Sequence, residues 1–152
     1  MTKVKRIWAR EILDSRGIPT VETACMIDTG SVSVASVPSG TSTGSHEALE
    51  LRDTESPRYL GRGVLKAIEN VNLIIGPSLV GLNPQDQFGI DKKLVELDGT
   101  ENKSKLGANS ILSVSEAVCK AGATDAKMQL YAWIFSLAQK GGITQKVKIP
   151  TP

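Results

Sequence analysis

Residues 4–37, VKRIWAREILDSRGIPTVETACMIDTGSVSVASV, hold three stretches of alternating side chains separated by turn residues. Strict alternation over a few residues is typical of β-strands, so we expect strands over 3–13, 20–28 and 32–37. The separating clusters DSRGIP and TGS are rich in turn formers and short, and short turns join antiparallel neighbours. This stretch therefore predicts a three-stranded antiparallel meander.

The hydrophobic period changes beyond residue 60. Four segments space apolar residues three or four positions apart, as in amphipathic helices: GVLKAIENVNLIIG (63–76), PQDQFGIDKKLVELDG (84–99), GANSILSVSEAVCKAGA (107–123) and QLYAWIFSLAQK (129–140). In the last segment we expect four residues to face inward: Leu130, Trp133, Ile134 and Leu137. Strands followed by helices favour an α+β fold, here a meander followed by a bundle of about four helices on one face of the sheet.

Composition narrows the possible partners. The chain has 152 residues and ordinary globular composition, which fits one domain. Its 18 basic and 16 acidic residues give a net charge of +2, and aromatic residues are sparse, so we expect neither a nucleic acid nor a membrane as partner. Without a secretory signal pattern or a long apolar run, we expect a cytoplasmic protein. Cys25 and Cys119 are expected to be buried, reduced thiols.

The stretch VPSGTSTGSHEALELRD (37–53) contains Gly40-Thr41-Ser42-Thr43-Gly44, which matches the G-x-S-x-G pattern of a serine hydrolase. The chain's one histidine, His46, lies four residues after Ser42 and has no evident route into a catalytic triad. A Walker A loop is excluded because no Lys-Ser/Thr pair follows. From the residues alone, two interpretations stay open: a surface loop rich in glycine and serine, or a loop that closes over a ligand.

Three stretches taken together resemble the N-terminal domain of the enolase family: AREILDSRGIPTVE (9–22), VPSGTSTGSHEALELRD (37–53) and LDGTENKSKLGANSILSVSEAVCKA (97–121). The resemblance runs from about residue 4 to residue 152. The family's domain is a three-stranded meander followed by helices, in agreement with the pattern above. Ser113 departs from the family, which normally has glycine there.

The resemblance implies a place in a lyase, the phosphopyruvate hydratase of glycolysis, which converts 2-phosphoglycerate to phosphoenolpyruvate and water with two Mg²⁺ ions. It implies that the loop after the third strand is the mobile active-site loop, and that Ser42 ligates the second Mg²⁺ when a barrel domain is present. Arg16 and Glu22 resemble residues of the homodimer contact. The expected loop residues are Ser39, Gly40, Thr41, Ser42, Thr43, Gly44 and His46.

The resemblance also implies what the chain lacks. In the family, the catalytic lysine, the catalytic acid and the other metal ligands belong to a C-terminal barrel domain. We expect residues 1–140 to be the capping domain and residues 141–152 to be a linker toward that barrel. The chain by itself is then expected to be inactive and to bind no Mg²⁺, because one serine offers too few oxygens. The alternative is an enolase-like protein-binding module without catalysis. The DSRG and LDGT runs disfavour a third interpretation, an epimerase of the wider superfamily.

Overall fold

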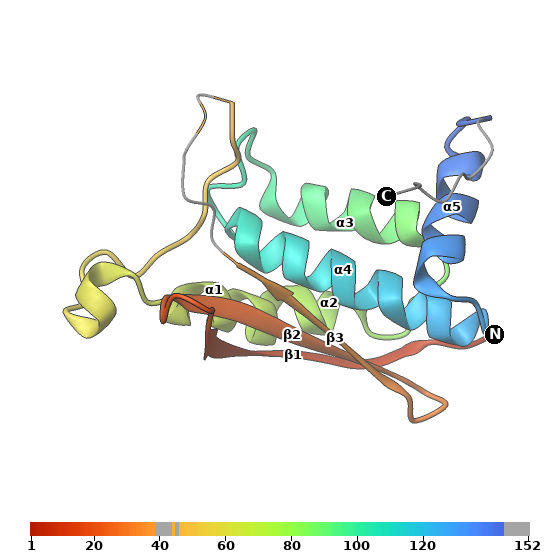
Figure 1. Cartoon of the computed structure of the whole chain (residues 1–152), viewed down its shortest axis with the longest axis horizontal. Helices are drawn as coiled ribbons and strands as arrows, with labels where there is room; N and C mark the ends of the chain where they lie inside the picture. Colours follow the sequence, from red (N-terminus) through yellow and green to blue (C-terminus); the bar gives the residue numbers. More distant parts are fainter. Residues whose placement is uncertain (39–43, 45, 145–152) are drawn as a thin grey trace.

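The computed structural model describes residues 1–38, 44 and 46–144. Within this part, β1 (Val4–Leu13), β2 (Pro19–Ile27) and β3 (Val32–Val37) form an antiparallel sheet in the order β1-β2-β3 (Figure 1). The predicted meander is confirmed. The central strand β2 buries its alternate residues against the helices, since Val21, Thr23, Cys25 and Ile27 are all buried.

A register shift near the start of β1 explains why its sequence has no cleanly apolar face. The pairing of β1 with β2 shifts between Val4 and Arg6, as at a β-bulge. Val4 therefore joins Ile7 and Ala9 among the buried residues, although an odd number of positions separates Val4 from Ile7. Simple alternation would have placed Val4 and Ile7 on opposite faces.

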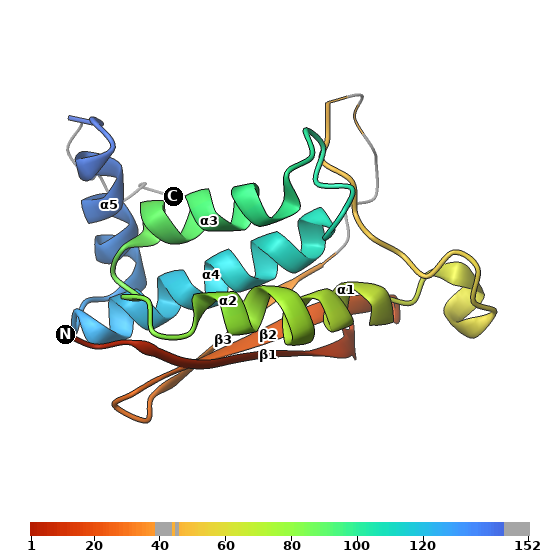
Figure 2. The same ribbon diagram turned by 180° about the vertical axis from the view of Figure 1, so that it is seen from behind.

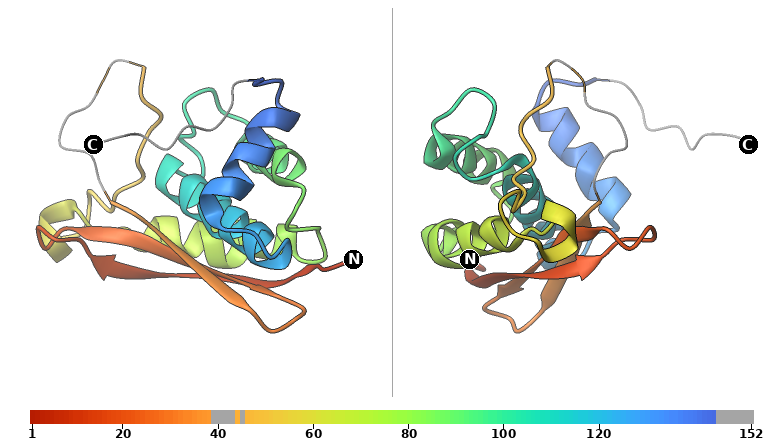
Figure 3. Two further views of the ribbon diagram at one scale, coloured as in Figure 1. Left: turned by 45° about the vertical axis from the view of Figure 1, so that its right-hand side comes forward. Right: turned by 90° about the vertical axis from the view of Figure 1, so that its left-hand side faces the viewer.

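The helices all lie on one side of the sheet. A continuous rod of α1 (Leu65–Asn70), the π-helical turn η2 (Val71–Ile75) and α2 (Gly76–Leu79) packs on β1. Helix α4 (Ala108–Asp125) covers β2 and β3, and α3 (Gln87–Asp98) lies on α4 (Figures 1 and 2). Figure 3 shows the opposite face of the sheet free of helices. The predicted α+β class is confirmed.

The predicted helical stripes supply part of the core, and the strands supply much of the rest. Val64, Val71 and Ile75 from the first segment are buried, as are Ile90 and Leu94 from the second. In α4 the buried apolar side chains are Val114, Ala117, Val118, Ala121 and Ala123. No helix in the described residues has the length and apolar character needed to span a membrane.

The prediction for the last helix, α5 (Leu130–Lys140), is wrong for two residues. Within α5, which the structure describes completely, only Trp133 is buried. Ile134 is 50% exposed and Leu130 is 37% exposed. The reason is that α5 crosses one end of α4 instead of lying along the sheet, so one narrow strip of its surface is covered (Figure 3).

Ser113 has a structural role at the helix–sheet interface. Its hydroxyl lies 2.8 Å from Thr23 Oγ1 of β2 and donates to the carbonyl oxygen of Ser110 (3.0 Å). Thr23 and Ser113 are both fully buried. A glycine at 113 would leave the Thr23 hydroxyl without this partner.

The two cysteines are free thiols, and burial raises the pKa of Cys25 to about 12.

Candidate functional site

The N-terminal end of the predicted loop is fixed on the start of β2. Strand β3 ends at Val37, which pairs with Val21 of β2. The hydroxyl of Thr20 donates a hydrogen bond to the carbonyl oxygen of Val37. Thr20 is buried, and the bond to Val37 is part-buried. The chain therefore enters the loop from a fixed point.

The C-terminal end of the loop is held by the turn before α4. The N–H of Leu49 donates to the carbonyl oxygen of Asn102 (2.7 Å), and the N–H of Ala108 donates to the carbonyl oxygen of Leu49 (2.8 Å). The side chain of Asn109 then accepts from the N–H of Leu51 (3.1 Å) and donates to the carbonyl oxygen of Leu51 (3.0 Å). The N–H and the carbonyl oxygen of both Leu49 and Leu51 are thus bonded to residues 102–109.

Gly107 allows this close approach. Its φ is +92°, a conformation that favours glycine. A Cβ atom at this position would lie 2.6 Å from Leu51 Cβ and 2.7 Å from Asn109 Oδ1. A larger residue at 107 would therefore push the end of the loop away from α4.

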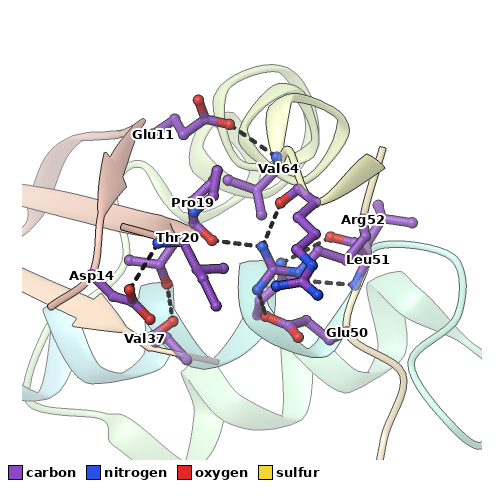
Figure 4. Close-up of polar contacts among 12 residues, drawn as sticks. Glu11, Asp14, Pro19, Thr20, Val37, Glu50, Leu51, Arg52 and Val64 are labelled. Carbon is purple, nitrogen blue, oxygen red and sulfur yellow. Dashed lines mark hydrogen bonds and ion pairs between the residues drawn. The ribbon is translucent and has the colours of Figure 1, made fainter. Parts of the chain in front are cut away.

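Arg52 connects the end of the loop to two other segments. Its Nη1 donates to the carbonyl oxygens of Pro19 and Arg62, both at 2.6 Å, and its Nη2 lies 2.5 Å from Glu50 Oε1 (Figure 4). The side chain of Arg52 is 14% exposed. Since a guanidinium carries five donors in a rigid plane, it can bridge several acceptors that one ammonium group would not reach together.

Acidic side chains hold the segment that follows Arg52. Asp53 is buried and accepts two N–H groups at the start of α1, at 2.7 and 3.0 Å. Glu11 of β1 pairs with the guanidinium of Arg58 and accepts the N–H of Val64 (3.0 Å). Burial by itself raises the pKa of Glu11, but the bonds from Arg58 and Val64 outweigh it and lower the pKa below its usual value. Arg58 and Val64 are thereby tied to β1, and Asp53 to the start of α1.

The turn between β1 and β2 is organised by Asp14. Its Oδ1 accepts the N–H groups of Arg16 (2.8 Å) and Ile18 (2.9 Å). The bond from Ile18 contributes most to lowering the pKa of Asp14 below its usual value. This turn leads directly into Pro19 and Thr20, which bond the two ends of the loop.

Most of the predicted loop residues cannot be compared with the structure. Gly44 and His46 are described and exposed. Five others lie outside the described residues: Ser39, Gly40, Thr41, Ser42 and Thr43. Their expected roles stay predictions.

The two residues of the predicted dimer contact lie at different places on the hairpin. Arg16 lies in the β1–β2 turn with Nη2 3.4 Å from Asp14 Oδ2. Glu22 lies on β2, with Oε1 2.6 Å from Nε of Arg10 and Oε2 3.3 Å from the hydroxyl of Ser36. Arg10 is a neighbour of Glu22 that sequence reasoning missed, although it faces Glu22 once the hairpin register is fixed.

The described residues contain no group of three or more histidine, cysteine, aspartate or glutamate side chains that could hold a metal ion. Magnesium takes about six oxygen ligands, and the hydroxyl of Ser42 would offer one. The part of this chain that the structure describes thus does not fit a complete magnesium site.

The anchors Thr20, Arg52 and Asn109 were not singled out from the sequence. Arg52 and Asn109 lie inside the matched stretches ELRD and GAN, but nothing in the residue types shows that their partners are backbone atoms of distant segments.

A comparison with protein-family models finds one that matches residues 4–134, described as the N-terminal domain of enolase. The match covers most of the chain and includes the meander, the ends of the loop and the helices from α1 to α4. The chain therefore belongs to the enolase N-terminal domain family.

Proposed function

We propose that this chain is the capping domain of an enolase, and that it supplies the active-site loop to a barrel domain that converts 2-phosphoglycerate to phosphoenolpyruvate. The observation that carries this proposal is the anchorage of the residues that flank the loop: Val37 is bonded to the start of β2, and residues 49–52 are bonded to the start of β2 and to the turn before α4. Family membership supports the reaction class.

In this proposal the chain contributes positioning and one ligand. Ser42 would supply one oxygen to the second Mg²⁺, and His46 would flank the closed site. The lysine base, the acid and the remaining ligands would come from the barrel. By itself the chain would be inactive.

The outer face of the sheet is the proposed contact with the homodimer partner. Trp8, Arg10, Glu22 and Val34 line a hollow of about 210 Å³ there, together with Ala24 and Val32. Tryptophan and arginine are among the residue types enriched in protein interfaces. Arg16 would contribute from the adjoining turn.

The test is phosphoenolpyruvate formation from 2-phosphoglycerate and Mg²⁺, using this chain with and without a separately made enolase barrel. We expect turnover in the mixture and none from the chain by itself. Ser42→Ala should lower the rate in the mixture, whereas Ser45→Ala, in the same loop, provides the matched control. Turnover by the isolated chain would contradict the proposal.

A non-catalytic binding module is the second candidate. It is favoured by the apolar residues exposed on α5, where Tyr131 is 68% exposed and Ile134 is 50% exposed. A mixture that stays inactive although the folded chain binds the barrel would favour this second candidate.

A further inference from the structure

We infer that Arg52 is a positioning residue for the active-site loop, and that it acts through the Pro19–Thr20 unit. This inference rests on the function proposed above. Two adjacent residues at the start of β2 hold opposite ends of the loop: Thr20 donates to the carbonyl oxygen of Val37, and the carbonyl oxygen of Pro19 accepts from Arg52 (2.6 Å). The groups that hold the two ends therefore lie on adjacent residues of β2.

Pro19 and Thr20 are held firmly within the fold. Both residues are buried, and they begin the central strand of the sheet. Thr20 pairs with Ile12 of β1, so the unit is also bonded into the hairpin. A shift of either loop end requires breaking one of these two part-buried hydrogen bonds.

Arg52 also bonds the loop end to a segment other than β2. The same Nη1 that donates to Pro19 donates to the carbonyl oxygen of Arg62, and Nη2 lies 2.5 Å from Glu50. These partners belong to three segments: the start of β2, the excursion over residues 54–63 and the loop end itself. A lysine at 52 would keep the charge but could not reproduce this planar set of donors.

The anchorage of the loop ends should affect how precisely Ser42 is positioned. Residues 38–48 lie between Val37, which is bonded to Thr20, and Arg52, which is bonded to Pro19. Ser42 lies within this stretch of the sequence. Misplacing a catalytic group by about an ångström can cost on the order of a hundredfold in rate. The contribution that we assign to Arg52 is therefore to the geometry of the loop ends, through its bonds to Pro19, Arg62 and Glu50.

The first test is amide hydrogen exchange by NMR on the chain by itself. The variants are Arg52→Lys and Thr20→Val, and the matched control is Arg62→Lys, which changes an exposed arginine side chain and leaves its carbonyl in place. We expect each of the two variants to raise exchange about tenfold at both loop ends, the Leu51 amide and the last residues of β3. The amide of Val118 in the core should keep its protection.

Coupling between the ends is the decisive result. Were Arg52→Lys to affect only Leu51 while Thr20→Val affected only β3, the Pro19–Thr20 unit would not link the two ends and the inference would be overturned. Equal effects of Arg62→Lys would overturn it as well.

The second test uses the mixture of chain and enolase barrel. Arg52→Lys should lower kcat about tenfold while the concentration of chain needed for half-maximal activity stays unchanged, with rates divided by the folded fraction from circular dichroism. If Arg52 only stabilised the fold, kcat per folded domain would equal the wild-type value, which contradicts a positioning role. If the wild-type mixture is inactive, the proposed function fails and the catalytic part of this inference fails with it. The exchange data would then still show whether the two loop ends are coupled.

Discussion

Asn72 and Ala9 exchange two hydrogen bonds across the outer edge of β1. The N–H of Ala9 donates to Asn72 Oδ1 (2.8 Å), and Asn72 Nδ2 donates to the carbonyl oxygen of Ala9 (3.2 Å). A side-chain amide in the π-helical turn η2 thus pairs with the strand edge as another strand would. Because a free edge can recruit another chain, this pair both stabilises the domain and protects it from edge-to-edge association.

Replacing Asn72 by alanine should destabilise the domain. The substitution leaves a part-buried N–H and carbonyl of Ala9 without partners, which costs about 1–3 kcal/mol. Urea unfolding followed by circular dichroism measures the change. Asn102→Ala, at an exposed asparagine, is the control and should change stability by less than about 0.5 kcal/mol. Equal stability of the Asn72 and Asn102 variants would show that the edge pair contributes nothing.

Ser113 and Thr23 should show energetic coupling. Ser113→Ala removes the partner of a buried Thr23 hydroxyl, and we expect a loss of about 1–3 kcal/mol in the free energy of unfolding. Adding Thr23→Val removes the unpaired hydroxyl, so the double variant should lose less than the sum of the single variants. A double-mutant cycle by urea unfolding measures this difference, and strict additivity would contradict a direct bond.

Gly107→Ala should displace the end of the loop from α4. The new Cβ would overlap Leu51, in addition to the cost of placing alanine at φ +92°. Gly30→Ala is the matched control, since Gly30 has φ +90° and a Cβ added there would meet nothing within 4 Å. Both variants place alanine at a positive φ that favours glycine, and we expect the larger loss of stability at 107, where the new Cβ also overlaps its neighbours. Thermal unfolding measures the decrease in Tm of each variant. Equal decreases in both would contradict the close approach of Gly107 to Leu51.

Acid should weaken the turn between α3 and α4 through Asp98. Its Oδ2 accepts the N–H of Leu106 (2.7 Å), and its Oδ1 accepts the N–H of Thr100 (3.0 Å). Burial by itself raises the pKa of Asp98, but these bonds, with that from the Thr100 hydroxyl, outweigh it and lower the pKa below 3.8. A carboxyl with a lowered folded-state pKa stabilises fully above its unfolded pKa, and this contribution is lost as the pH falls through the folded value.

We therefore expect the free energy of unfolding to fall below about pH 4, and to fall less steeply in Asp98→Asn. Urea unfolding at a series of pH values measures both slopes. Glu101→Gln removes one negative charge from an exposed side chain and is the control for net charge. If the Asp98→Asn profile runs parallel to the wild-type profile, Asp98 is not a source of the acid sensitivity.

Periodicity sufficed to place the strands and the first three helical segments, and it also identified the buried face of β2 and of α3, although the register shift in β1 escaped it. Val21, Thr23, Cys25 and Ile27 alternate into the core, and Ile90 and Leu94 lie one helical turn apart. Periodicity failed in α5, since an apolar stripe reports which residues can be buried and not how much surface the neighbouring helix covers. Ile134 is apolar and still half-exposed because α5 only crosses the end of α4.

The candidate site was less predictable for a different reason. The resemblance directed attention to residues 37–53, but the anchors work through backbone carbonyls. The carbonyl oxygen of Pro19 lies 33 residues from Arg52, and that of Leu51 lies 58 residues from Asn109. Every residue has a carbonyl, so the sequence marks none of them as a partner. Only the fold brings these groups together.

The most direct test of the proposed function is a chimera in which residues 1–152 of this chain replace the N-terminal domain of an active enolase. The covalent link removes any dependence on association between separate parts. We expect the chimera to form phosphoenolpyruvate from 2-phosphoglycerate and to lose this activity on Ser42→Ala. A chimera that is folded and dimeric, with an intact barrel, but forms no phosphoenolpyruvate would contradict the proposed function.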